Sequence, residues 1–229
     1  MKTYSIAIDG PSASGKSTAA KLVAKKLNFL YIDTGAMYRA LTLLMIDKGL
    51  DCKSRKDATI ALTDCDIKEN REGQIFLNGI DVTSRVRMPD VTSLVSFACA
   101  HLEVREHMVK LQQKMAGNEN VIMDGRDIGT VVLKNATLKI YQIASSYARA
   151  ERRQKEFNEK GVNNLSIEEI QKDIERRDYL DSNRENSPLR KADDAIELDT
   201  SNLSIDEEVN AIIDLFRKKI GEEEWNNLV

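Results

Sequence analysis

The sequence predicts an α/β fold with a parallel sheet of five strands and a small antiparallel sheet inserted into it. Short apolar runs alternate with helical periodicity along most of the 229 residues, a pattern typical of a parallel sheet covered on both faces. One Asn-Gly pair between two apolar runs indicates the antiparallel insert. With 41% apolar and 31% charged residues, the chain has the composition of a helix-rich globular domain.

Two strands and two helices are expected in the N-terminal part of the chain. Residues 4–8 form a short apolar strand, followed by a turn rich in Gly and Ser at residues 10–15. A helix follows Ser17, since apolar side chains recur at helical spacing at Ala20, Val23, Ala24 and Leu27. Residues 29–32 predict the second strand, and residues 37–46 predict the second helix.

The central part of the chain predicts a small antiparallel sheet and then more helix. Residues 75–77 and 80–82 flank Asn78-Gly79, which is the strongest short-range signal for a hairpin. We therefore place a small antiparallel sheet within about residues 65–86. Helical periodicity returns over about residues 91–115.

The C-terminal half supplies the other strands of the main sheet, at residues 121–123, 138–143 and 195–198. Residues 147–190 are highly charged and lack a long apolar face. Capping boxes predict that one helix begins at Ser166 and another at Ser204. The second helix would direct four apolar side chains inward, those of Val209, Ile212, Ile213 and Phe216.

The charge and cysteine content argue against several classes of function. The 34 Lys and Arg against 37 Asp and Glu leave a net charge of −3, so no basic excess indicates a nucleic acid or a membrane as a partner. We expect no signal peptide and no membrane span. Cys52, Cys65 and Cys99 are widely spaced and lack a metal-ligand pattern, which favours reduced thiols in a cytoplasmic protein. His101 and His107 suggest neither a metal site nor a triad.

The most specific motif is a phosphate loop, G-x-x-x-x-G-K-[ST], at residues 10–17 between a predicted strand and a predicted helix. Small residues let backbone N–H groups turn toward phosphate oxygens, and the helix directs its positive end at the same anion. Lys16 is expected along the β- and γ-phosphates, and the Ser17 hydroxyl beside Mg²⁺. The residues assigned to the ATP phosphates are Gly10, Pro11, Ser12, Ala13, Ser14, Gly15, Lys16, Ser17 and Thr18.

Two other classes of phosphate-loop protein lack their motifs in this sequence. A GTPase switch needs D-x-x-G and [NT]-K-x-D elements, and neither is present. Transport and mechanical ATPases need an extended apolar strand that ends in Asp-Glu, which is also missing. A phosphotransferase acting on a small molecule remains, and it needs a second anion-binding site that faces the phosphate loop.

Arginines at the predicted carboxyl edge of the sheet could form that second site. Arg39 follows the second strand by one helical turn, and Arg126 follows the third strand directly. Arg177, Asp181 and Arg184 are spaced to share one helical face. That spacing is equally typical of a solvated helix held by i,i+4 ion pairs, so it leaves the role of the face open.

The chain resembles the bacterial cytidylate kinases, of the nucleoside monophosphate kinase superfamily, nearly from end to end. The segments that carry the resemblance are GPSASGKST at 10–18, DTGAMYR at 33–39, DGRDIGT at 124–130 and RDYLDSNR at 177–184. DTGAMYR and DGRDIGT are specific to this family, whereas the phosphate loop alone is not. The Asn-Gly hairpin matches the family's insert in its monophosphate-binding region.

The resemblance implies one P-loop kinase domain over residues 1–229 with a five-stranded parallel core. Within it we expect a monophosphate-binding region at about 34–118, its antiparallel insert near 63–88, and a short lid at about 147–166. The implied reaction transfers the γ-phosphoryl group of ATP to CMP or dCMP with Mg²⁺, giving CDP or dCDP and ADP. A monomer is the family expectation, with no nucleic acid or membrane as partner.

The resemblance also assigns the residues of the CMP site: Thr34, Arg39, Ser96, Arg105, Arg126, Asp127, Arg177, Asp181 and Arg184. Ser96, Arg105 and Asp127 would read cytosine, whose exocyclic amine needs an acceptor and whose O2 and N3 need donors. Three arginines would hold the monophosphate, Arg39, Arg126 and Arg184, with Arg177 and Asp181 near the ribose and Thr34 as an additional polar contact. Arg149 and Arg153 would belong to the lid.

No catalytic base is expected, because the attacking phosphate oxygen is already mostly ionised near pH 7. Lys16, Arg126 and Arg184 would instead stabilise the charge of the transferring group. Two alternatives stay open. A shikimate-kinase-like enzyme would need a carboxylate base, for which Asp33 is the candidate at a strand end, and a regulator would bind nucleotide without turnover.

Overall fold

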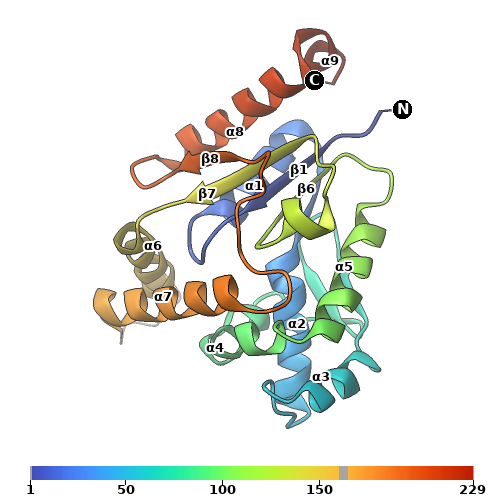
Figure 1. The fold of residues 1–229 in the computed structure, drawn as a ribbon, viewed down its shortest axis with the longest axis vertical. Helices are drawn as coiled ribbons and strands as arrows, with labels where there is room; N and C mark the ends of the chain where they lie inside the picture. Colours follow the sequence, from blue (N-terminus) through green and yellow to red (C-terminus); the bar gives the residue numbers. More distant parts are fainter. Residues whose placement is uncertain (1, 160–164, 229) are drawn as a thin grey trace.

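The computed structural model describes residues 2–159 and 165–228, and its centre is a parallel sheet of five strands (Figure 1). The strands run in the order β2-β6-β1-β7-β8, and every neighbouring pair is parallel. Their bounds are β1 Ser5–Asp9, β2 Leu30–Asp33, β6 Val121–Gly125, β7 Leu138–Ile143 and β8 Ile196–Asp199. This confirms the predicted α/β class and all five core strands.

One face of the sheet is covered by α1 (Lys16–Leu27) and α8 (Ile205–Ile220). Alternate residues of a strand point to opposite faces, so Ile6 and Ile8 of β1 pack on this side. Phe216 of α8 lies at the centre of this cluster, edge-on to Tyr4 and Phe29. The helix α9 (Glu222–Leu228) follows, and its end lies near the N-terminus in Figure 1.

The other face carries α2 (Thr34–Asp47), α4 (Pro89–Ala98) and α5 (Leu102–Ala116). Ala7 of β1 points to this side and joins a larger apolar cluster that includes most of α2. In Figure 1 these helices extend away from the sheet on the side opposite α8. The cluster joins the insert firmly to the sheet, so the carboxyl ends of β1, β2 and β6 meet elements from both parts of the fold.

The insert contains α3 (Arg55–Leu62) and a three-stranded antiparallel sheet of β3 (Ile67–Glu69), β4 (Ile75–Leu77) and β5 (Ile80–Asp81). Asn78 and Gly79 both have positive φ, 50° and 81°, as a two-residue hairpin turn between twisted strands requires. The predicted hairpin is therefore confirmed. A short 3-10 turn, η1 (Arg85–Arg87), connects the sheet to α4.

Two helix boundaries differ from the sequence-based expectation. The helical pattern over residues 91–115 is split between α4 and α5 at residues 99–101, where the His101 ring bonds the Cys52 carbonyl oxygen at 3.0 Å. Both helices contribute to the same cluster, so their apolar spacing reads as one pattern. Helix α2 begins at Thr34, three residues before the predicted start, because the Asp33 side chain caps it by accepting from the Ala36 N–H.

The charged segment forms two paired helices, α6 (Ser146–Glu159) and α7 (Ile167–Asn183). They share a short apolar seam of Ala150, Ile170 and Ile174. Both predicted capping boxes are present, at Ser166 and at Ser204. The expected lid at 147–166 includes residues 160–164, which lie outside the described residues. No helix within the described ranges is long and apolar enough to cross a membrane.

Candidate active site

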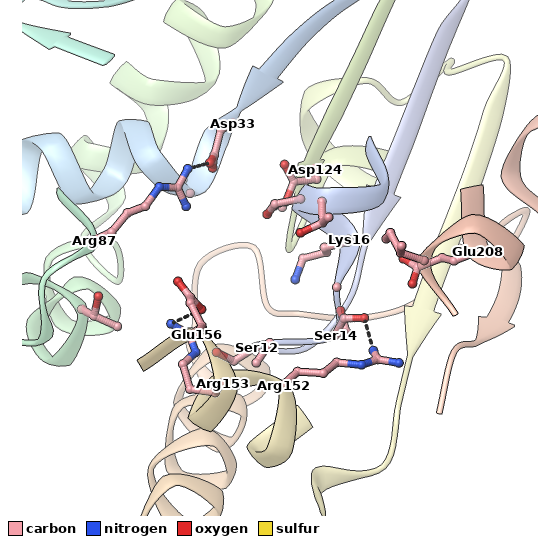
Figure 2. Close-up of a pocket in the computed structure, with 18 of the residues that line it drawn as sticks. Ser12, Ser14, Lys16, Asp33, Arg87, Asp124, Arg152, Arg153, Glu156 and Glu208 are labelled. Atoms are coloured by element: carbon pink, nitrogen blue, oxygen red, sulfur yellow. Dashed lines mark hydrogen bonds and ion pairs between the residues drawn. The ribbon is translucent and has the colours of Figure 1, made fainter. Parts of the chain in front are cut away.

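A cavity of about 530 Å³ opens at the carboxyl edge of the sheet. The phosphate loop forms its floor, η1 and the start of α2 lie on one side, and α6 and α8 on the others (Figure 2). Figure 2 shows Lys16 at the centre, with Arg87 and Arg153 across the cavity from Glu208. The cavity is thus enclosed by the phosphate loop and by residues from the insert, the lid segment and the C-terminal helix.

Lys16 is buried at the start of α1, and its Nζ donates to the Pro11 carbonyl oxygen at 2.8 Å. Burial, reinforced by the positive charge of Arg126, lowers the pKa of Lys16 to about 7. Burial and Arg126 both disfavour the charged form of Lys16, and the negative charge of a bound anion would offset both effects.

Ser17 and Asp124 provide oxygen atoms beside the phosphate loop. The Ser17 hydroxyl donates to Asp124 Oδ2 at 2.6 Å, and the Tyr31 hydroxyl donates to Asp124 Oδ1 at 2.8 Å. Asp124 is buried at the end of β6, and burial together with nearby Asp33 raises its pKa. A hydroxyl and a carboxylate next to the phosphate loop are the protein ligands of Mg²⁺ in P-loop enzymes, so these residues fit that ion.

Arginines from three elements form a second cationic group at the cavity. Arg39, Arg126 and Arg177 come from α2, the end of β6 and α7, and all three carry groups buried from solvent. The Nε atoms of Arg39 and Arg177 have no hydrogen-bond partner among the described residues. Burial and neighbouring guanidinium groups lower the pKa of Arg39 to about 10 and that of Arg177 to about 9. Guanidinium groups crowded together in this way favour an anionic ligand such as a phosphate.

Asp127 lies in a buried polar pocket next to this group. Arg105 donates to Asp127 Oδ2 at 2.5 Å, and a nitrogen of Arg184 lies 3.9 Å from Asp127 Oδ1. Asp181 links the two sites, because it accepts from Arg126 Nε at 2.8 Å and lies 3.7 Å from Arg184. Five residues proposed for the CMP site thus form one continuous network: Arg105, Asp127, Arg184, Asp181 and Arg126. Ser96 is buried on α4, and the cation of Arg105 stacks over Tyr38 with its centre 5.3 Å from the ring.

Comparison with known proteins agrees with this geometry. A family model described as cytidylate kinase matches residues 6–218. The chain belongs to the cytidylate kinase family. The cytidylate kinase of Lactobacillus johnsonii is 52% identical over 93% of this chain and 94% of its own length. That of Enterococcus faecalis is 49% identical over 96% of this chain and 98% of its own.

Solved structures extend the similarity to the fold alone. A gluconokinase from Sinorhizobium meliloti matches with a TM-score of 0.51 at 13% identity, covering 98% of this chain and 97% of its own. An uncharacterized protein from Eubacterium ventriosum matches with a TM-score of 0.52 at 13% identity over 95% of this chain and 99% of its own. At this identity only the shared P-loop kinase architecture follows, which agrees with the predicted fold class.

Several residues at the cavity or beside the phosphate loop were not assigned to the substrate sites from the sequence, although Arg152 was expected in the lid. Arg87 of η1 lines the cavity and donates to Asp33 Oδ2 at 2.7 Å. Arg152 of α6 donates to the Ser14 carbonyl oxygen at 3.0 Å, behind the phosphate loop. Asp178 of α7 accepts from the Ser12 N–H at 2.8 Å. Asp124 could have been found, since it ends an apolar strand, but nothing around Arg87 in the sequence indicates a site.

Two residues that were predicted to contact substrate are instead bonded to other groups of the protein. Arg149 is buried beneath the phosphate loop, where it donates to the Ser12 carbonyl oxygen at 2.9 Å and pairs with Asp178 at 2.5 Å. Thr34 donates to the carbonyl oxygen of Asp124 at 2.7 Å, so its proton already joins the ends of β2 and β6. Arg153, by contrast, lines the cavity and lies 3.6 Å from Glu156.

Proposed function

We propose that the protein transfers the γ-phosphoryl group of ATP to CMP or dCMP, giving CDP or dCDP and ADP. One observation carries this proposal beyond family membership. Arg39 and Arg126 line the cavity that contains Lys16, and the buried Nε atoms of Arg39 and Arg177 have no hydrogen-bond partner among the described residues. A kinase for a phosphorylated acceptor needs two anion sites that face one another, and these groups supply the second.

The residues divide between the two substrates. The phosphate loop and Lys16 would bind the ATP phosphates, as the sequence predicts. Three arginines would hold the CMP phosphate: Arg39, Arg126 and Arg184. Ser96, Arg105 and Asp127 would read the base, and Arg177 and Asp181 would lie near the ribose. The network through Asp181 supports this division, because it connects the phosphate-binding arginines to the base-reading pocket.

The reaction needs no base from the protein. An ionised oxygen of the CMP phosphate forms the new bond to the γ-phosphorus, and the bond from that phosphorus to the β,γ-bridging oxygen breaks. Lys16, Arg126 and Arg184 would stabilise the negative charge spread over the transferring group. Binding of the triphosphate is expected to raise the pKa of Lys16 from about 7, so that it is fully charged when it acts.

Mg²⁺ would be held by the Ser17 hydroxyl and the Asp124 carboxylate, together with the ATP phosphates. Bound there, the ion would neutralise phosphate charge. The Ser17 hydroxyl donates to Asp124 Oδ2, so these two oxygen atoms lie 2.6 Å from one another. Asp124 therefore keeps the Ser17 hydroxyl directed to one place before any ligand arrives.

We further propose that residues 147–166 close over the bound nucleotides as a lid. Arg152 and Arg153 on α6 already line the cavity, and exclusion of water would prevent hydrolysis of ATP. A monomer in the cytoplasm is expected, and the unpaired thiols of Cys52, Cys65 and Cys99 are consistent with a reducing compartment.

The contacts of Asp33 disfavour a kinase that acts on a hydroxyl acceptor. Such an enzyme needs a free carboxylate base, and Asp33 is instead engaged as the cap of α2 and as the partner of Arg87. Burial alone would raise the pKa of Asp33, but Arg87 and Arg39 lower it below its ordinary value. A carboxylate held in this way is a weak base.

The test measures ADP release from Mg-ATP with CMP, dCMP, UMP, AMP and shikimate, one at a time. Rapid turnover with CMP and dCMP alone is the expected result. Turnover with UMP at a similar rate would retain the kinase and contradict the base-reading role of Asp127 and Arg105. No release of ADP with any acceptor, while ATP still binds, would favour a regulator that binds nucleotide without turnover.

A further inference from the structure

Asp9, the last residue of β1, makes contacts that the proposed reaction does not require. Its side chain is 4% exposed, and Asp9 directly precedes Gly10 of the phosphate loop. Oδ1 accepts from the backbone N–H of Ile128 and Oδ2 from that of Gly129, both at 2.7 Å. One carboxylate therefore holds the two peptide groups that follow Asp127.

These two peptide groups begin an irregular turn that follows β6 and lies outside the sheet, so strand pairing does not position it. Residues Ile128–Val132 form one turn of π-helix, a rare conformation. The first N–H groups of any helical turn have no partner within it, so they depend on an acceptor from outside. The Asp127 carbonyl oxygen accepts from the Val131 N–H at 2.8 Å on the far side. The Asp127 backbone is thus held in two ways. Its carbonyl oxygen is bonded by Val131 within the turn, and the peptide groups that follow it are bonded by Asp9.

The fit between Asp9 and the turn is close. A methyl group at Gly129 would lie 3.3 Å from Asp9 Oδ2 and 3.1 Å from Cδ of Lys139. Glycine at this position therefore allows the backbone to approach the carboxylate. The packing between Asp9 and Gly129 is tight. A small change in the Asp9 side chain would therefore shift the turn, and the Asp127 side chain would move with it.

We propose that Asp9 is a positioning residue for acceptor recognition, which sets the distance between the cytosine-reading Asp127 and the phosphate loop. The inference rests on the proposed function. The end of β1 leads into the phosphate loop, which would bind ATP, and through Asp9 it also holds the backbone next to Asp127, which would read CMP. Asp9 is not among the residues that line the cavity, and its effect passes through the backbone of residues 127–129.

Asp9→Asn tests this proposal with a minimal change of shape. Asparagine keeps one acceptor oxygen but turns an NH₂ group toward the second N–H, so one of the two bonds is lost. We expect the KM for CMP to rise at least about fivefold while the KM for Mg-ATP changes less than about twofold. The ratio of kcat/KM for CMP to that for UMP should fall by a similar factor, because Asp127 is displaced. The charge of Asp9 also acts on Lys16, so kcat is not the deciding measurement.

Two further variants separate positioning from general loss of stability. Gly129→Ala perturbs the same contact from the opposite side and should reproduce the split between the two KM values, even if Asp9→Asn does not fold. Thr137→Val is the matched control. Thr137 Oγ1 accepts the Ser5 N–H at 3.2 Å at the other end of β1, so its loss should lower the melting temperature without changing either KM.

Calorimetric titration of CMP into each protein without ATP adds a measurement that does not depend on turnover. Weaker CMP binding by the first two variants, with normal binding by Thr137→Val, would support the role of Asp9. Equal changes in both KM values, or an unchanged CMP to UMP ratio in folded variants, would overturn it. Failure of the wild-type protein to use CMP would instead refute the proposed function itself.

Discussion

Replacement of Arg177 by methionine is expected to stabilise the ligand-free protein and to weaken its binding of CMP. Burial and the guanidinium groups of Arg39, Arg126 and Arg153 lower the pKa of Arg177 far below its ordinary value, to about 9. A difference of that size between the folded and unfolded chains corresponds to about 5 kcal/mol at pH 7, as an upper limit. Methionine retains most of the buried apolar stem but loses the attraction to Asp181, so we expect a net gain of about 1–3 kcal/mol.

For a chain of this length each kcal/mol raises the melting temperature by about 2–4 °C, so the expected rise is about 2–12 °C. The assay is thermal unfolding at pH 7 in a buffer without phosphate, followed by titration of CMP. Added phosphate should stabilise the wild-type protein more than the variant. Arg176→Met is the matched control, because Arg176 is the preceding residue of α7 and forms an exposed pair with Asp173 at 2.7 Å.

A melting temperature of Arg177→Met below that of the wild-type protein would refute the reasoning. It would mean that Arg177 has a stabilising partner and that the cluster does not lack negative charge. Unchanged affinity for CMP would be equally damaging, because the strained cation would then have no functional role.

Three other changes test separate parts of the site. Lys16→Ala should reduce turnover at least about 1000-fold while circular dichroism shows an unchanged fold; near-normal activity would exclude Lys16 from catalysis. Asp127→Ala should raise the KM for CMP far more than that for ATP, and an equal loss of CMP and UMP use would contradict base reading. Glu69, whose pKa burial and Asp33 raise to about 8, binds its proton more tightly when folded, so stability falls as pH rises from about 4.5 to 8. Glu69→Gln should remove up to about 3.5 kcal/mol of that decline, as urea unfolding at pH 5 and pH 8 would show; parallel pH profiles would disprove it.

Features with a local cause were predictable from the sequence. The phosphate loop, the Asn78-Gly79 hairpin and the capping box at Ser166 each depend on a few neighbouring residues, and each is where the pattern placed it. The division between α4 and α5 was not, because both helices pack on one cluster and their apolar spacing runs across the break. Local chemistry therefore predicts turns and caps better than it predicts the ends of consecutive helices.

The site shows the same contrast. Arg126 and Asp127 follow a strand end, so their place at the cavity edge could be predicted from the order of elements. Arg87 reaches Asp33 across 54 positions of sequence through the packing of the insert, and no local pattern encodes that contact. The family resemblance assigned Arg149 to the lid, yet its side chain is buried against Ser12. A charged residue in the sequence indicates that its side chain will interact with another group, but the sequence alone does not identify that group.

Helix α7 connects the phosphate loop to the arginine group of Arg39, Arg126 and Arg177. Arg177 belongs to that group, and the next residue, Asp178, accepts from the Ser12 N–H of the phosphate loop. Neighbouring residues of a helix are 1.5 Å apart along its axis and 100° apart around it, so one inserted residue would separate these two roles completely. Helix α7 must therefore keep its residue count from Arg177 onward for both contacts to persist.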